Sequence, residues 1–142
     1  MKVSNILIAK IKGFEGCKLQ SYQDSVGVWT IGVGHTKGVM KGQIINAKQA
    51  DLYLQSDLVP VESYINSLPH KFTQGEFDAL ADFAFNLGID ALRKSTLIRK
   101  VLQGSNDSDI QAEFNKWTHA GGQVLRGLVT RRAWEATRWK QN

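Results

Sequence analysis

Cysteine, proline and long apolar runs are all scarce in this sequence. It contains one cysteine, Cys17, and two prolines. A single cysteine excludes an internal disulfide and a multi-cysteine metal site, so stability does not depend on an oxidising compartment. The apolar N-terminal residues are interrupted by Lys10 and Lys12, and no small-residue cleavage pattern follows them. This stretch therefore predicts an amphipathic helix, not a signal peptide or a membrane span, and we expect synthesis in a cytoplasm.

The size and composition are those of one ordinary globular domain. The chain has 142 residues, of which 42% are apolar and 22% are charged. A chain of this length buries about 70% of its unfolded surface on folding, so its core can suffice for folding without disulfides or metal ions. We expect a single domain over residues 1–142, with no cofactor and no metal ion.

The net charge of +5 is compatible with nucleic acid, an anionic cell wall or lipid headgroups, and does not choose among them. The densest basic cluster lies near the C-terminus, at Arg126, Arg131, Arg132, Arg138 and Lys140. Such clusters are typical of a solvated helix face. No zinc-finger, glycine-loop or aromatic ribonucleoprotein motif is present, so we expect no nucleic-acid partner. We also expect no stable membrane insertion, and a monomer.

The N-terminal third combines a helix with β structure. Apolar residues from Leu7 to Phe14 follow helical spacing, and Ser4 or Asn5 can cap that helix. The turn-forming run at 23–27 joins two β-rich segments into a hairpin. The predicted strands are 18–22, 28–33 and a short one around 43–45.

Almost every segment after residue 46 is predicted to be helical. Pro60 lacks an N–H and clashes with the preceding turn, so we expect a kink or a fresh start there. Thr73 and Glu76 have the spacing of a capping box. The predicted helices are 47 to about 59, 60 to about 67, 73–87, 96–102, about 107–117 and 128–139.

This order of elements predicts an α+β fold. A small sheet-bearing lobe, about 14–60, is joined by a long helix to a helical lobe, about 61–142 plus the helix within 1–13. A cleft between two lobes is a natural place for a ligand, and we expect the hairpin to line one wall of it.

Two carboxylates in different surroundings suggest glycosidic bond cleavage. That reaction needs a carboxylic acid to protonate the leaving oxygen and a carboxylate on the other side of the sugar. Glu15 follows Phe14 at the end of an apolar helix, where partial desolvation would favour the protonated acid. Asp24 lies in a polar turn and is expected to stay ionised. Two acids separated in this way by their environments match the pattern of an acid and a base.

Two further polar residues follow in the same segment. Thr30 is six residues beyond Asp24, on the returning strand, where its hydroxyl can help to hold a water molecule. His35 can hydrogen-bond to the backbone or a carboxylate and fix the loop. Each residue also has an ordinary interpretation, as a helix-end charge, a turn former, a β-branched strand residue or a structural histidine.

The combination resembles the phage-type lysozymes of glycoside hydrolase family 24, the endolysins of tailed phages. The resemblance rests on Glu15, Asp24 and Thr30 within FEG…Y-x-D-x-x-G-x-W-T-I-G-x-G-H-T, and it continues through 83–88, 95–104 and 114–132. It covers nearly the whole chain. It implies a lysozyme-like fold and hydrolysis of the β-1,4 bond between N-acetylmuramic acid and N-acetylglucosamine in peptidoglycan.

The resemblance also implies roles for particular residues. Glu15 would be the general acid, and Asp24 and Thr30 would position the attacking water, an inverting arrangement with carboxyl groups about 6.5–9.5 Å apart. The glycan would contact His35, Thr36, Phe85, Asn86 and Ser95. The partner would be peptidoglycan strands, reached in the periplasm after release from the host cytoplasm.

Other functions remain open at this point. A lytic transglycosylase acts on the same polymer with one acid/base residue and no water, so the pair of Asp24 and Thr30 disfavours it. A catalytically inert wall-binding module could use the same cleft and cationic surface. Phe85 also fits core packing, because it shares a helical period with Leu80 and Ala81. For Arg131 and Arg132, a solvated helix face is as good an interpretation as contact with anionic wall polymers.

Overall fold

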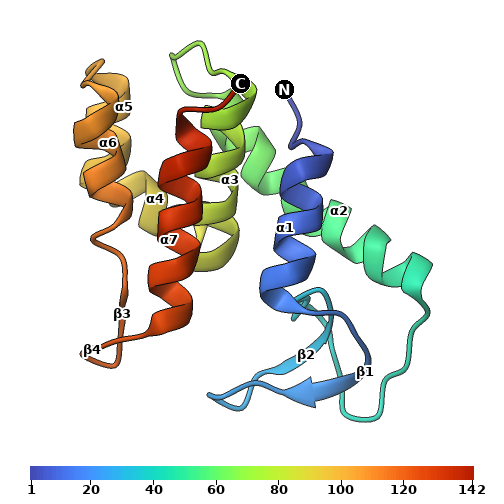
Figure 1. Cartoon of the computed structure of the whole chain (residues 1–142). Coiled ribbons are helices and arrows are strands. Elements are labelled where there is room, and N and C mark those ends of the chain that lie inside the picture. Colours follow the sequence, from blue (N-terminus) through green and yellow to red (C-terminus); the bar gives the residue numbers. More distant parts are fainter. The chain divides into compact units, whose positions relative to one another are not determined.

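The computed structural model describes residues 1–142, and their contacts form two compact units (Figure 1). The sheet unit is Asn5–Pro60, and the helical unit is Met1–Ser4 with Val61–Asn142. The prediction of an α+β fold, with an N-terminal hairpin followed by helices, is confirmed. The elements are α1 (Asn5–Glu15), β1 (Lys18–Gln23), β2 (Trp29–Gly32), α2 (Ala47–Asn66), α3 (Gln74–Leu87), α4 (Ile89–Lys94), α5 (Thr96–Leu102), α6 (Asp107–Phe114), β3 (His119–Ala120), β4 (Gln123–Val124) and α7 (Arg126–Trp139).

The sheet unit is built on the hairpin of β1 and β2. The strands are antiparallel, with Tyr22 opposite Thr30, and the register is irregular between Lys18 and Tyr22. The predicted third strand is reduced to one bridge, between Gln20 and Ile44. Behind the hairpin lies a small apolar core of Ile31, Ile45 and Ala50, with Val39 and Tyr53 packed against it. This core fixes β2 and the loop that follows it.

Helix α2 runs from Ala47 to Asn66 with Pro60 inside it. Of the two outcomes expected at Pro60, the fresh start is therefore wrong, and the kink stays a prediction. Proline removes one backbone hydrogen bond from a helix. Pro60 itself is exposed, whereas buried residues at helical spacing continue on both sides of it. They are Leu54, Leu58, Val61 and Ile65. Burial of this stripe offsets the missing bond. No helix in the chain has both the length and the apolar character needed to cross a membrane.

The helical unit is centred on α3, which packs along α7, while α6 packs against α7 as well (Figure 1). The predicted capping box is confirmed: Thr73 Oγ1 accepts from Glu76 N, and Glu76 Oε2 accepts from Thr73 N. Helix α4 and the β3–β4 hairpin were not predicted, and α6 ends at Phe114, before the expected residue 117. These are short elements with weak periodicity, which is why the sequence pattern misses them.

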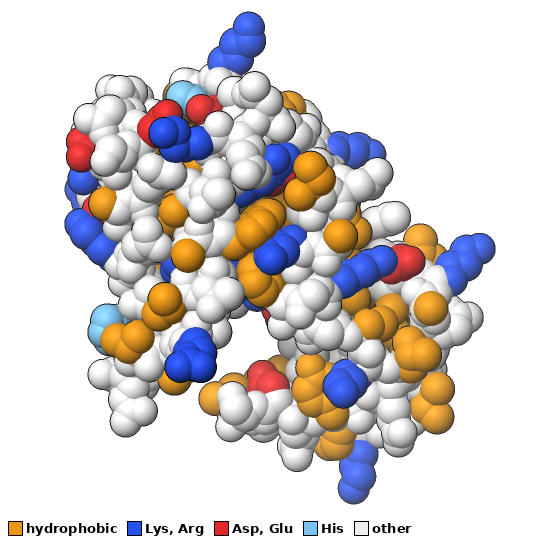
Figure 2. Space-filling view, viewed as in Figure 1, with side chains coloured by type: hydrophobic (Ala, Val, Ile, Leu, Met, Phe, Trp, Pro, Cys, Tyr) orange, Lys and Arg blue, Asp and Glu red, His pale blue; other side chains and the backbone are white.

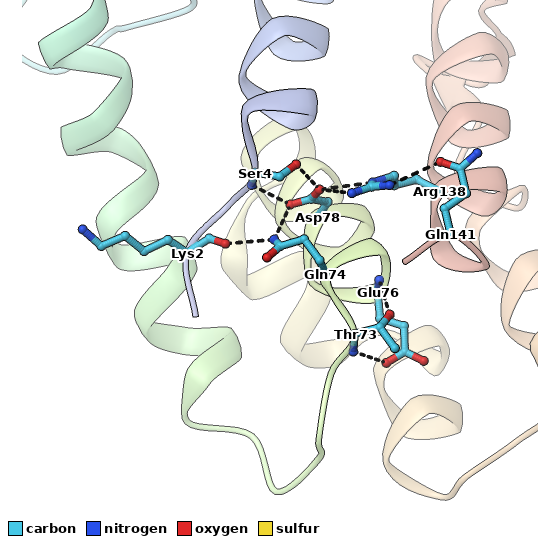
Figure 3. Close-up of polar contacts among 8 residues, drawn as sticks. All are labelled: Lys2, Ser4, Thr73, Gln74, Glu76, Asp78, Arg138 and Gln141. Carbon is cyan, nitrogen blue, oxygen red and sulfur yellow. Dashed lines mark hydrogen bonds and ion pairs between the residues drawn. The ribbon is translucent and has the colours of Figure 1, made fainter.

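A buried carboxylate ties the first residues of the chain to α3 and α7 (Figure 3). Asp78 is fully buried, and it accepts hydrogen bonds from the Ser4 backbone N–H and the Ser4 hydroxyl. Arg138 Nη2 lies 2.8 Å from Asp78 Oδ2. Gln74 Nε2 bridges Asp78 Oδ1 and the Lys2 carbonyl. Every polar atom of this carboxylate is therefore engaged inside the helical unit.

The solvated face predicted for the C-terminal basic cluster is wrong for three of its members. Arg131, Arg132 and Arg138 are 5%, 0% and 3% exposed. Arg131 pairs with Asp82, Arg132 with Glu135, and Arg138 with Asp78. Buried arginines need such partners because an unpaired buried charge is strongly unfavourable. The lysine and arginine side chains visible in Figure 2 are spread over the drawn face without forming one basic patch.

Candidate active site

Glu15 is the last residue of α1, and its carboxylate is held against the backbone of the loop after β2. Gly16 takes φ 71° and donates its N–H to the Lys12 carbonyl at 2.9 Å, which ends the helix. Glu15 is half-buried. A Cβ at Gly34, which has φ 68°, would lie 3.1 Å from Glu15 Oε1. Glycine at this position therefore leaves the room that the carboxylate occupies.

Asp24 begins the hairpin turn, and the turn itself orients its carboxylate. The Gly27 N–H donates to the Asp24 carbonyl at 3.0 Å, and Gly27 has φ 87°. Asp24 Oδ1 accepts the N–H groups of Val26 at 3.0 Å and Val28 at 2.8 Å. Aspartate is favoured at the start of such turns because it bonds to amides that follow it. Two backbone donors thus fix one oxygen of the carboxylate, leaving Oδ2 for a ligand.

Thr30 is linked to Asp24 through Val28. The Thr30 hydroxyl donates to the Val28 carbonyl at 3.0 Å, while Val28 N–H donates to Asp24 Oδ1. A carbonyl can only accept, so the single hydroxyl hydrogen of Thr30 is committed to Val28. Toward any further partner, Thr30 Oγ1 is an acceptor. The structure therefore brings Asp24 and Thr30 together as two acceptors on one hydrogen-bonded turn.

Tyr22 belongs to the same face of the hairpin, and sequence reasoning gave it no role. It is opposite Thr30 in the register and two residues before Asp24, so strand alternation puts all three on one side. Burial, then the negative charges of Glu15 and Asp24, raise the pKa of Tyr22 above its usual value. The Tyr22 phenol consequently lies within electrostatic reach of both carboxylates. Its spacing from Asp24 is the signal that could have revealed it.

His35 is buried, and its Nδ1 is directed at a carboxylate of α2. It lies 3.0 Å from Asp57 Oδ1 and 2.8 Å from Oδ2, and the imidazole stacks on Tyr53 with ring centroids 4.2 Å apart. The His35 and Ile31 backbones exchange two hydrogen bonds. These contacts fix the Gly-His-Thr loop. Thr36 is exposed, and its carbonyl accepts the Val39 N–H. Contact of His35 and Thr36 with glycan stays a prediction.

The other three predicted glycan contacts belong to the helical unit. Phe85 is half-buried in α3, and Asn86 Oδ1 accepts from Arg132 Nη2 at 2.7 Å. Ser95 is buried and caps α5, since its hydroxyl accepts the Ile98 N–H and donates to the Leu92 carbonyl. The Ser95 hydroxyl is thus engaged within the protein, and a role for these three residues in sugar binding stays a prediction.

A metal centre has no basis in the arrangement of side chains. No group of three or more histidine, cysteine, aspartate and glutamate residues in 1–142 is placed to hold an ion. Cys17 is an exposed free thiol. The side chains of Glu15, Asp24, Thr30 and Tyr22 carry carboxyl, hydroxyl and phenol groups.

Comparison with known proteins gives one consistent answer. The model of the family described as Phage lysozyme matches residues 12–135. The chain belongs to the phage lysozyme family. It is 36% identical over 137 residues to an endolysin of Acyrthosiphon pisum secondary endosymbiont phage 1, covering 93% of each chain. It is 40% identical over 139 residues to the endolysin of Bacillus phage PZA, covering 95% of this chain and 54% of that one.

The fold of this chain is also that of a solved muramidase domain. The muramidase domain of SpmX from Asticaccaulis excentricus has a TM-score of 0.90 at 36% identity, covering 99% of both chains. The lysozyme-like architecture is therefore confirmed, and the relatives support a glycosidase of the endolysin or muramidase kind. The chain spans about half the length of the Bacillus phage relative, so that protein's full activity does not transfer directly.

Proposed function

We propose that this protein is an endolysin that hydrolyses the β-1,4 bond between N-acetylmuramic acid and N-acetylglucosamine in peptidoglycan, for lysis of a phage host. Glu15 donates a proton to the glycosidic oxygen as general acid. Asp24 and Thr30 position the attacking water on the opposite side of the sugar, so the reaction inverts the anomeric centre. Membership of the phage lysozyme family and the endolysin relatives support this assignment.

The hydrogen bonds around Val28 are the observation that carries the water-positioning role. Because the Thr30 hydroxyl donates to Val28, a water at this site would donate one hydrogen to Thr30 Oγ1. Its other hydrogen would go to Asp24 Oδ2, since Oδ1 already accepts two amides. A water that gives both hydrogens to these acceptors keeps its oxygen lone pairs for the anomeric carbon. As the bond forms, Asp24 takes up the released proton.

The general-acid role of Glu15 is tested by Glu15→Gln, which keeps the shape of the side chain and removes its acidic proton. We expect clearing of permeabilised Gram-negative cells to fall by at least about 100-fold, since general acid catalysis typically supplies 10²–10⁴. Thermal unfolding should stay nearly unchanged. Asp90→Asn, an equivalent change at an exposed carboxylate in α4, is the control and should keep full activity.

Product analysis separates the hydrolase from the alternatives. Hydrolysis adds one water and leaves reducing ends, whereas a transglycosylase leaves 1,6-anhydro ends that are one water lighter. NMR of the first-formed products reports inversion as a change of anomer. Retained clearing by Glu15→Gln would remove the acid assignment. Binding to insoluble peptidoglycan without release of reducing ends would identify an inert wall-binding module.

A further inference from the structure

We propose that Tyr22 is a substrate-binding residue whose hydroxyl donates a hydrogen bond to an oxygen of the sugar bound beside Asp24 and Thr30. This inference rests on the proposed function, because it concerns the same site. Asp24 and Thr30 position the water in the proposed mechanism, and the Tyr22 hydroxyl would be a third group on the same hairpin, one that binds the glycan.

The placement of Tyr22 follows from the hairpin alone. It is directly opposite Thr30, and directly opposed residues in an antiparallel pair have Cβ atoms about 4.5–5.5 Å apart on the same face. Asp24 is two residues further along and shares that face by alternation. Its carboxylate is turned back toward Val26 and Val28 by the two amide bonds. The Tyr22 ring therefore stands beside the position of the proposed water.

The charges of both carboxylates reach the Tyr22 phenol. After burial, the negative charges of Glu15 and Asp24 both act on the phenol and raise its pKa. Tyrosine hydroxyls in partly apolar surroundings usually have a hydrogen-bond partner. A sugar oxygen located between an acid on one side and the water-holding pair on the other would supply that partner.

The protonation state of Tyr22 suits a donor. Burial and the two negative charges raise its pKa, so the phenol keeps its hydrogen throughout the pH range in which Glu15 and Asp24 can work. Sugar hydroxyl, ring and acetamido oxygens all accept hydrogen bonds. Because the contact would form in the bound substrate as well as during reaction, its loss should weaken binding and change kcat little.

The test compares glycan binding with and without the Tyr22 hydroxyl. Glu15→Gln blocks hydrolysis, so binding of soluble, purified peptidoglycan fragments can be measured by calorimetry in that background. Adding Tyr22→Phe removes only the hydroxyl, and we expect Kd to rise about 3- to 10-fold, as for one neutral hydrogen bond. In the enzyme with Glu15 intact, Tyr22→Phe should raise KM by a similar factor and leave kcat within about 2-fold.

The matched control is Tyr64→Phe in the helical unit. Tyr64 is also half-buried with a raised pKa, which burial causes, but its ring lies beside Arg93 and not beside carboxylates. We expect no change in Kd, KM or kcat for this variant.

Two outcomes would overturn the inference about Tyr22 and leave hydrolysis intact: an unchanged Kd for Tyr22→Phe, or a loss confined to kcat. If the protein does not hydrolyse peptidoglycan and Tyr22→Phe still weakens fragment binding, the proposed function fails and the binding role of Tyr22 stands. The two proposals are thus separately testable.

Discussion

The two units of this protein use the same charged residue types in opposite ways. In the sheet unit, Glu15 and Asp24 are half-buried, and Asp24 is oriented by backbone amides with one oxygen left over. In the helical unit, Asp78 and Asp82 are fully buried and paired with arginines of α7. A carboxylate whose oxygens are all engaged stabilises a fold, whereas one that keeps an oxygen available can act on a substrate.

The largest expected effect comes from removing Asp78. Asp78→Ala leaves Arg138 buried without its partner and frees the Ser4 amide, so we expect the free energy of unfolding to fall by about 3–5 kcal/mol. Denaturant unfolding measures this loss. Activity per folded molecule should be retained at low temperature.

Asp24→Asn is the matched change in the sheet unit, because an amide oxygen can still accept from Val26 and Val28. We expect unfolding to shift by less than about 0.5 kcal/mol and activity to fall about 100-fold or more. Equal losses of stability in the two variants would contradict the distinction between structural and site carboxylates.

The parts of the fold that could be predicted from sequence are those encoded locally. The turn from Asp24 to Val28 needs an aspartate at its start and Gly27 in a left-handed conformation, and both are visible in a few residues. The capping box of Thr73 and Glu76 is equally local. Glu15, Asp24 and Thr30 occur within a span of sixteen residues, so their motif could be recognised without knowing the fold.

The arginine partners could not be predicted because they are distant in sequence. Asp78 and Arg138 are 60 residues apart, and Asp82 and Arg131 are 49 apart. The basic cluster of α7 therefore looked like a solvated face. Asp78 and Asp82, four residues apart among the apolar residues of 77–84, were the available signal, since buried acids in such a stripe require cationic partners.

Two buried glutamates of the helical unit should respond to pH in opposite directions. Burial, then the hydrogen bond and charge of Asp82, raise the pKa of Glu135 well above the ordinary 4.5. The hydrogen bond from Lys116 is the main cause that lowers the pKa of Glu113. At a pH between 4.5 and the raised pKa, Glu135 is protonated to a greater extent in the folded chain than in the unfolded chain. Its contribution to stability is therefore present below about pH 4.5 and is lost as the pH rises through the raised pKa.

For Glu113 the sign is reversed: its contribution is present above about pH 4.5 and is lost as pH falls through the lowered value. The free energy of unfolding of Glu135→Gln and of Glu113→Gln, measured across a range of pH, reports the two contributions separately. Relative to the unsubstituted protein, Glu135→Gln should gain stability as pH rises, and Glu113→Gln should recover stability on acidification. Because Lys116 is 66% exposed, the change at Glu113 should stay below about 1 kcal/mol. Changes in the same direction would contradict these assignments.

The smallest effect is expected at an exposed ion pair of the sheet unit. Lys12 Nζ lies 2.7 Å from Asp51 Oδ1, but the two side chains are 42% and 53% exposed. Water and salt screen such pairs, so Asp51→Asn should cost less than about 0.5 kcal/mol in the free energy of unfolding, and 1 M salt should remove most of that.

Asp57→Asn is the comparison within the same unit, because Asp57 is paired with the buried His35, whose side chain is only 9% exposed. The amide oxygen of asparagine can still accept from His35 Nδ1. A hydrogen bond to a charged group with little solvent access is nevertheless the stronger one, so we expect a loss of about 1 kcal/mol that persists in 1 M salt. If Asp51→Asn and Asp57→Asn lowered the free energy of unfolding equally, the burial of His35 would not strengthen its pairing with Asp57. The loop carrying Gly34 would then owe its position to packing of the His35 ring on Tyr53 and not to the carboxylate.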